Sequence, residues 1–180
     1  MSKSVNINPV MSELDLPLER DLFLRQLIRD LAGTLEDIVG VEEAAGYISI
    51  VGQHIGDWIN KSYTAAAGVD SFSPEQVAAI LVDLKKRILG DFYIIAQDES
   101  KIVFGNKKCP FEDKVVGHPS MCMMTSNVFG GITAQHLGYA RVELQQTLAR
   151  GDSGCRVVIH LKPMPESHVM GGREYYRKVV

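Results

Sequence analysis

Apolar residues recur at three- and four-residue intervals between Leu18 and Ile38, which is the spacing of one face of an amphipathic α-helix. The stripe consists of Leu24, Leu27, Ile28, Leu31, Leu35 and Ile38. Because a helix gains most of its stability from packing such a face, the pattern requires a core or a second chain beside it. The stripe is long and follows a loose arm, so we expect it to form the helix-to-helix interface of a two-fold homodimer.

The helical period of apolar residues continues after Gly40 to about residue 66, where Gly46, Gly52 and Gly56 interrupt it. Glycine inside a helix costs stability unless another group must approach the backbone closely. That group is either a neighbouring helix or a ligand. Of the two, we expect a neighbouring helix.

A third helix and a hairpin are predicted next. Ser73 is a suitable N-cap, Pro74 fits the first helical position, and Gly90 ends the helix. The β-branched and aromatic runs at 91–97 and 101–106 flank a short polar stretch, which favours a β-hairpin.

The rest of the chain is expected to hold one more helix and a second hairpin. The helix starts at about Cys122 and breaks or ends near Gly130 and Gly131, and the final strand begins at Cys155. This order favours the α+β class, with N-terminal helices packed on an antiparallel sheet that is built from two hairpins with an intervening helix.

Length and composition limit the function classes. A chain of 180 residues, 46% hydrophobic and 23% charged, fits one globular domain. We place it at 18–162, after an N-terminal arm at 1–17 and before a C-terminal extension at 163–180. The net charge of -3 gives no attraction to nucleic acid or to an anionic membrane, and the sequence has neither a long apolar span nor a signal-peptide pattern. We therefore expect a cytoplasmic protein with no direct nucleic-acid or membrane partner.

The chain has three cysteines, Cys109, Cys122 and Cys155. An odd number in a reducing compartment argues against a disulfide framework and leaves metal binding, redox sensing or simple burial. The expected fold places each cysteine at the end of a strand or helix, where side chains from distant segments can converge. We therefore expect a single thiol-rich site on one side of the sheet.

Three chemistries would suit such a site. Zinc needs four ligands, so His118, Glu143, His136 or water would complete the set. An iron–sulfur cluster does not need closely paired cysteines. A metal-free redox sensor would use Cys122, because a helix N-terminus lowers the pKa of a thiol.

Five short motifs stand out in the chain: Cys109-Pro110-Phe111, Cys122 to Thr125, Phe129-Gly130, Gly138-Tyr139-Ala140, and Gly151-Asp152 with Cys155. Through these motifs the chain resembles the family called methanogen output domain 1, which occurs alone and within signalling proteins. The resemblance covers about residues 18–162 and implies a role in signal transduction.

A more distant similarity is to the 4-vinyl-reductase-type small-molecule-binding domains, which are often dimeric and hold a structural zinc at a terminal hairpin. This similarity implies that Cys155 is the last zinc ligand, that Cys122 is the upstream ligand and that Glu143 lies near the position of a Glu ligand. Thr147 stands where that family has its remaining Cys. The zinc site would therefore lack a ligand unless Cys109 or Glu143 supplies one.

Aromatic residues indicate a possible small-molecule pocket. His54, Trp58, Tyr93 and Phe129 are the candidates for its lining, although large aromatic side chains more often fill a core. The sequence favours a sensory or output domain that regulates a partner protein and binds either a small ligand or a metal or cluster through its cysteines. The alternative is a cysteine-ligated zinc or iron–sulfur protein with reductase-like activity.

Overall fold

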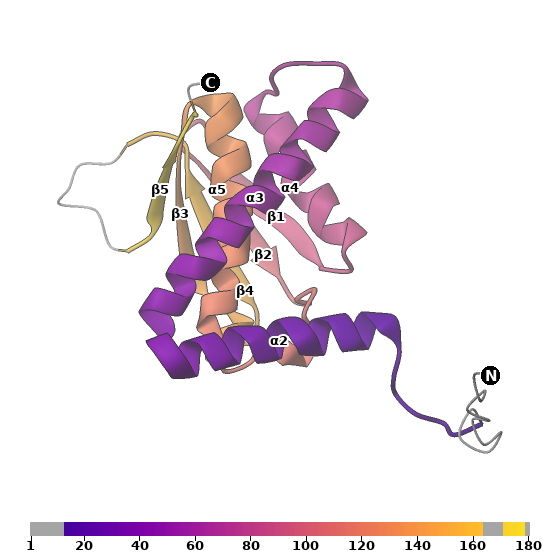
Figure 1. Ribbon diagram of the computed structural model, residues 1–180. Helices are drawn as coiled ribbons and strands as arrows, with labels where there is room; N and C mark the ends of the chain where they lie inside the picture. Colours follow the sequence, from indigo (N-terminus) through magenta and orange to yellow (C-terminus); the bar gives the residue numbers. More distant parts are fainter. Residues whose placement is uncertain (1–12, 164–170, 179–180) are drawn as a thin grey trace, which may run out of the picture.

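Helices packed on an antiparallel sheet give the computed structural model an α+β fold, which confirms the expected class (Figure 1). The structure describes residues 13–163 and 171–178. Most of the predicted arm at 1–17 and part of the predicted extension at 163–180 therefore lie outside the described residues.

The described helices follow the periods of the sequence. They are α2 (Arg20–Val39), α3 (Val41–Ala67), α4 (Pro74–Arg87) and α5 (Cys122–Leu137). Short 3-10 turns are η1 (Glu112–Val115), η2 (Pro119–Met121) and η3 (Leu148–Arg150). Helix α4 begins as predicted, because the Ser73 side chain accepts a hydrogen bond from the Gln76 N–H while the Gln76 side chain accepts one from the Ser73 N–H.

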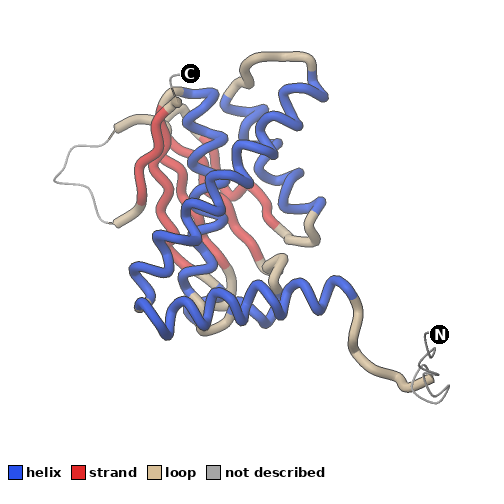
Figure 2. Tube along the Cα trace, viewed as in Figure 1, coloured by secondary structure: helices blue, strands red, loops and turns tan. Residues whose placement is uncertain are grey.

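One antiparallel sheet contains all the described strands (Figure 2). They are β1 (Phe92–Gln97), β2 (Lys101–Asn106), β3 (Tyr139–Gln146), β4 (Cys155–His160) and β5 (Arg173–Tyr176), in the spatial order β1-β2-β4-β3-β5. The two predicted hairpins are β1–β2 and β3–β4, and they meet where β2 pairs with β4. Strand β5, which comes from the segment expected to be an extension, pairs with β3.

Helix α5 lies between α3 and the sheet (Figure 1). Its Phe129 ring is fully buried and meets the rings of Phe92 and Phe104 edge-on, with centroid distances of 5.4 Å to each. Such aromatic contacts stabilise a core beyond the apolar area that they bury. Phe129, a candidate for lining a pocket, is therefore a core residue.

The predicted break in α5 near Gly130 and Gly131 is wrong, because the helix continues to Leu137. A side chain at Gly130 would overlap the ring of Tyr175 in β5. The Tyr175 hydroxyl lies 2.8 Å from the Ser126 hydroxyl, one turn earlier in the helix. Gly130 therefore gives β5 a place to pack on α5, and tertiary contact outweighs its poor helix propensity.

Two of the three glycines in α3 permit the predicted close helix packing. A Cβ atom at Gly52 would lie 3.0 Å from the Asn127 Cβ and 3.2 Å from the Met124 Cα, and one at Gly56 would lie 3.3 Å from the Val128 Cα. At Gly46 a Cβ would meet nothing within 4 Å. The helix-packing interpretation is thus confirmed for the first two positions only.

We predict that Gly52→Val lowers the free energy of unfolding by about 1–3 kcal/mol, because the new side chain would force α3 away from the α5 backbone. The matched control is Gly46→Val in the same helix, which enters open space and should change stability by less than about half a kcal/mol. Urea unfolding followed by circular dichroism measures both. Equal effects would show that the α3–α5 contact is not tight at Gly52.

Candidate ligand-binding site

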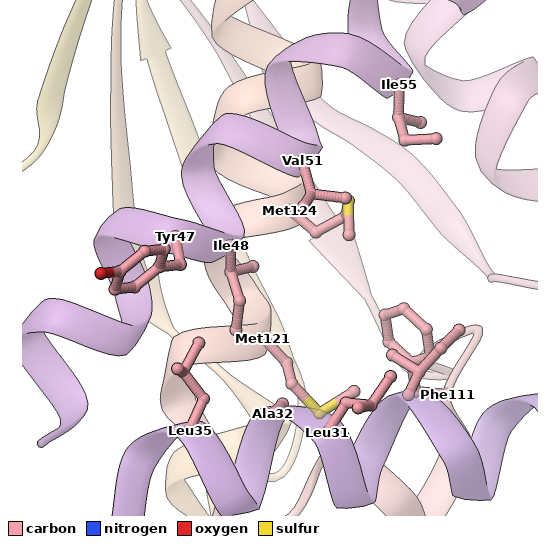
Figure 3. A pocket seen from close by; sticks show the side chains of 11 residues that line it. Leu31, Ala32, Leu35, Tyr47, Ile48, Val51, Ile55, Phe111, Met121 and Met124 are labelled. Carbon is pink, nitrogen blue, oxygen red and sulfur yellow. The ribbon is translucent and has the colours of Figure 1, made fainter. Parts of the chain in front are cut away.

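A pocket of about 390 Å³ lies between α2 and α3 (Figure 3). Its lining is apolar except for the Tyr47 hydroxyl and the thioether sulfurs: Ile28, Leu31, Ala32, Leu35, Tyr47, Ile48, Val51, Ile55, Phe111, Met121 and Met124. The two helices supply most of these side chains, and the remaining three come from the β2–α5 connection and the start of α5. Apolar pockets of this size are typical sites for small molecules.

Polar contacts hold α2 in place as one wall of the pocket. The Glu36 carboxylate lies 2.7 Å from His118 Nδ1 and accepts a hydrogen bond from the Ser120 N–H at 3.1 Å. Near the start of α2, Arg25 Nη1 lies 2.6 Å from Glu112 Oε2. These contacts tie α2 to the β2–α5 connection, so the wall rests on a few polar contacts together with apolar packing.

His118, a predicted metal ligand, belongs to this attachment of α2. A Cβ at Gly33 would lie 2.9 Å from His118 Cε1, so the imidazole ring packs directly on the helix backbone. Burial raises the pKa of Glu36, but hydrogen bonds from Ser120 and His118 outweigh it and leave the pKa below the ordinary value. His118 thus pairs with a carboxylate of α2.

A second and smaller cavity, of about 30 Å³, lies beside the pocket and is bordered by all three cysteines and by Lys85. We call it the lysine–thiol cavity. All three cysteines are free thiols and are partly buried. Phe111 and Met121 line both this cavity and the apolar pocket.

Lys85 is the unusual member of this cavity, because only 5% of the residue is exposed. Its ammonium donates a hydrogen bond to the Thr125 hydroxyl at 2.8 Å and lies 5.2 Å and 5.4 Å from the ring centroids of Phe92 and Phe129. None of the described side chains that line the cavity is acidic. Burial lowers the pKa of Lys85 to about 8, although the neighbouring thiols act in the opposite direction.

The predicted metal site finds no support in the part of the chain that the structure describes. No three His, Cys, Asp or Glu side chains there are grouped so as to hold a metal ion. A metal cation among the thiols would also lie next to the Lys85 ammonium, which borders the same cavity and would repel it. The other proposed ligands have different neighbours: Glu143 lies 3.2 Å from His160 Nε2, and His136 Nε2 lies 2.6 Å from Asn60 Oδ1. The described donor set therefore gives no support to the predicted zinc or iron–sulfur site, and the metal stays a prediction.

The expected low pKa of Cys122 is also wrong. Burial, followed by the neighbouring thiols of Cys155 and Cys109, raises the pKa of Cys122 to about 12. Burial likewise raises the pKa of Cys109. A protonated thiol is a weak nucleophile, so the helix N-terminus does not make Cys122 a reactive redox sensor.

The four residues proposed to bind a small ligand do not line the apolar pocket. His54 and Trp58 are exposed on α3, and Trp58 is 66% exposed. The Tyr93 ring of β1 packs across Gly105, and Phe129 is in the core. The sequence signal for the actual pocket was the pairing of the α2 stripe with apolar residues at four-residue spacing in α3, namely Tyr47, Val51 and Ile55.

We predict a pH-dependent effect of Lys85→Met on stability. The lysine titrates near 10.5 in the unfolded chain and near 8 in the fold, so only the unfolded chain binds this proton between those values. Lys85 therefore makes the free energy of unfolding rise with pH across that window, by about 3 kcal/mol. At pH values below the window, the buried charge destabilises the fold by the same amount. Lys85→Met should remove this rise, whereas the exposed neighbour Lys86→Met should keep it.

Denaturant unfolding of the three proteins at about pH 7 and pH 10 measures the difference. The same pH dependence in Lys85→Met and in the wild type would contradict the burial of a charged Lys85.

None of the helices in the described residues is long and apolar enough to cross a membrane. No curated protein sequence matches the chain. Among solved structures, the crystal structure of a trafficking protein particle complex subunit 3 from Naegleria fowleri covalently bound to palmitic acid has a similar fold, with a TM-score of 0.55 and 12% sequence identity. That match covers 87% of this chain and 99% of the other chain. Residues 27–160 match the family described as Methanogen output domain 1, and the chain belongs to that family.

Proposed function

We propose that this output domain is controlled by an apolar small molecule that binds between α2 and α3. The observation that carries the proposal is the apolar pocket of about 390 Å³ formed by the two helices. Filling it would remove from water both the ligand and the side chains that line the pocket, which is the main favourable term in such binding. The solved structure of the same fold holds palmitic acid covalently, which supports the idea that this fold accommodates an apolar chain.

A ligand in the pocket would act on α2, because this helix forms one wall and is otherwise held by few polar contacts. A ligand that prefers one position of α2 shifts the population toward it. Several apolar residues of α2 are exposed and do not line the pocket: Phe23, Leu24, Leu27 and Ile38. We propose that this exposed face of α2 binds a second copy of the chain and that ligand binding alters that contact.

The first test uses a solvatochromic, uncharged dye, Nile red, as the probe of the pocket. We expect saturable binding by the wild type and at least about tenfold weaker binding by Val51→Trp, because the larger side chain fills the pocket. The matched control is Ile50→Trp, at a neighbouring α3 residue of similar exposure, 54% against 50%, which does not line the pocket. Fluorescence titration gives the three dissociation constants.

Equal affinities of Val51→Trp and Ile50→Trp would contradict binding in the pocket. The proposed function would be contradicted if the wild type showed no saturable binding of Nile red and if decanol did not raise its midpoint of thermal unfolding. A ligand at about a hundredfold excess over its dissociation constant stabilises a fold by about 2.7 kcal/mol, so a shift in the midpoint would be easy to observe.

The predicted homodimer through α2 stays a prediction, and a charge placed on the exposed face tests it. We expect the wild type to be a dimer at micromolar concentration and Leu27→Asp to be a monomer, because a buried unpaired carboxylate destabilises an apolar interface. Val69→Asp is the control, since Val69 is 41% exposed, as Leu27 is 42% exposed, but follows α3 at its far end from α2. Light scattering coupled to gel filtration measures the masses, and a monomeric wild type would end the idea.

A further inference from the structure

We infer that the natural ligand is an amphiphile, an aliphatic chain with a carboxylate head, whose chain occupies the apolar pocket and whose head pairs with Lys85 in the lysine–thiol cavity. This inference rests on the proposed function and names the chemical class of the ligand for the same site.

The first argument is that the pocket and the cavity are neighbours with a common wall. Phe111 and Met121 line both of them. Residues in the first turn of α5 line one space or the other: Met124 lines the apolar pocket, whereas Cys122 and Thr125 line the lysine–thiol cavity. A single molecule that passes this wall would therefore contact both surfaces.

The wall itself can yield. Met121 packs in a small cluster with Ala32 of α2 and with Phe111, and this cluster also includes Cys109 and Cys122. Methionine has three rotatable bonds and adapts its shape to neighbouring groups more readily than branched side chains do. A change of the Met121 rotamer would connect the two spaces without moving the sheet.

The second argument is the missing counter-ion of Lys85. A buried ammonium is costly unless it is paired with an opposite charge, and Lys85 has one hydrogen bond to a neutral hydroxyl and two aromatic rings near it. The three thiols that share the cavity are poor counter-ions, because burial raises the pKa of two of them, Cys109 and Cys122. The described side chains around Lys85 supply no negative charge, and the anionic head of a ligand would supply it.

The third argument concerns the size of the head group. The cavity of about 30 Å³ has space for a group of about the size of one or two water molecules. A planar carboxylate suits this space and forms short, charge-assisted hydrogen bonds with an ammonium. A phosphate or sulfate head group, with its tetrahedral set of oxygens, is larger than a carboxylate and fits this space less well.

The test compares three ligands with the same chain, dodecanoate, dodecanol and dodecylamine, below their micelle concentrations, by displacement of Nile red at about pH 7. We expect the wild type to bind dodecanoate at least about tenfold more tightly than dodecanol, the ratio expected for one charge-assisted hydrogen bond, and to bind dodecylamine most weakly. Lys85→Met should bind dodecanoate no better than dodecanol. Lys86→Met, at an exposed lysine, should keep the wild-type order.

The outcomes separate this inference from the proposed function. Equal binding of the three ligands by the wild type, with loss of all binding in Val51→Trp, would overturn the carboxylate inference and leave the apolar pocket in place. No binding of any ligand would overturn the proposed function. Because the ligand series uses the wild type, the inference can be rejected even if Lys85→Met fails to fold.

Discussion

The close packing of α5 against α3 on one side and against the sheet on the other fixes the positions of the cavities. The helices can approach because α3 presents glycine at the two contact points, and α5 is consequently buried around most of its circumference. Once α5 is fixed, Met124 in its first turn lines the apolar pocket with α2 and α3, whereas Cys122 and Thr125 line the lysine–thiol cavity with residues of β2, β4 and α4. The apolar pocket and the lysine–thiol cavity are therefore adjacent for a simple helical reason: residues one position apart point about 100° apart.

Helix α2 is a different kind of element, because it covers the pocket without being part of the main core. It joins α3 through Gly40, whose φ of +84° is a backbone conformation that other residues adopt with strain. Its attachment depends on the Glu36 carboxylate, which meets His118 and Ser120, and on a few apolar contacts. Elements with few buried contacts open at lower free energy than the core does, so α2 is the part of the described fold best suited to respond to a ligand.

Sequence patterns predicted the elements whose periodicity is local, and missed what depends on contacts between distant segments. The helical stripes and the Ser73 cap gave α2, α3 and α4, but the break expected at Gly130 ignored Tyr175, a residue 45 positions later that packs on it. The cysteines at element ends do border one cavity, yet no metal-ligand set forms there. Lys85 was overlooked because it begins the charged run 85–87, although it continues the buried stripe of α4. That stripe consists of Val77, Ile80, Leu81 and Leu84, and a lysine in register with it was the available signal.

The presence of Lys85 changes how the three cysteines should be understood. The three thiols do not form a cluster but border the same cavity as an ammonium, which would repel a second cation more strongly in this poorly solvated site than in water. They are also not made into strong nucleophiles, because the same burial that lowers the pKa of Lys85 raises the pKa of Cys109 and Cys122. The three thiols therefore act as small polarisable side chains that give the Lys85 ammonium a weakly polar environment. A fold that carries a buried cation without an anion loses stability in its ligand-free state, and this loss is recovered when a ligand brings the anion. Phe111 and Met121 line both the apolar pocket and the cavity of Lys85, so a ligand that extends from one space into the other would contact them and would meet the apolar surface and the charge together.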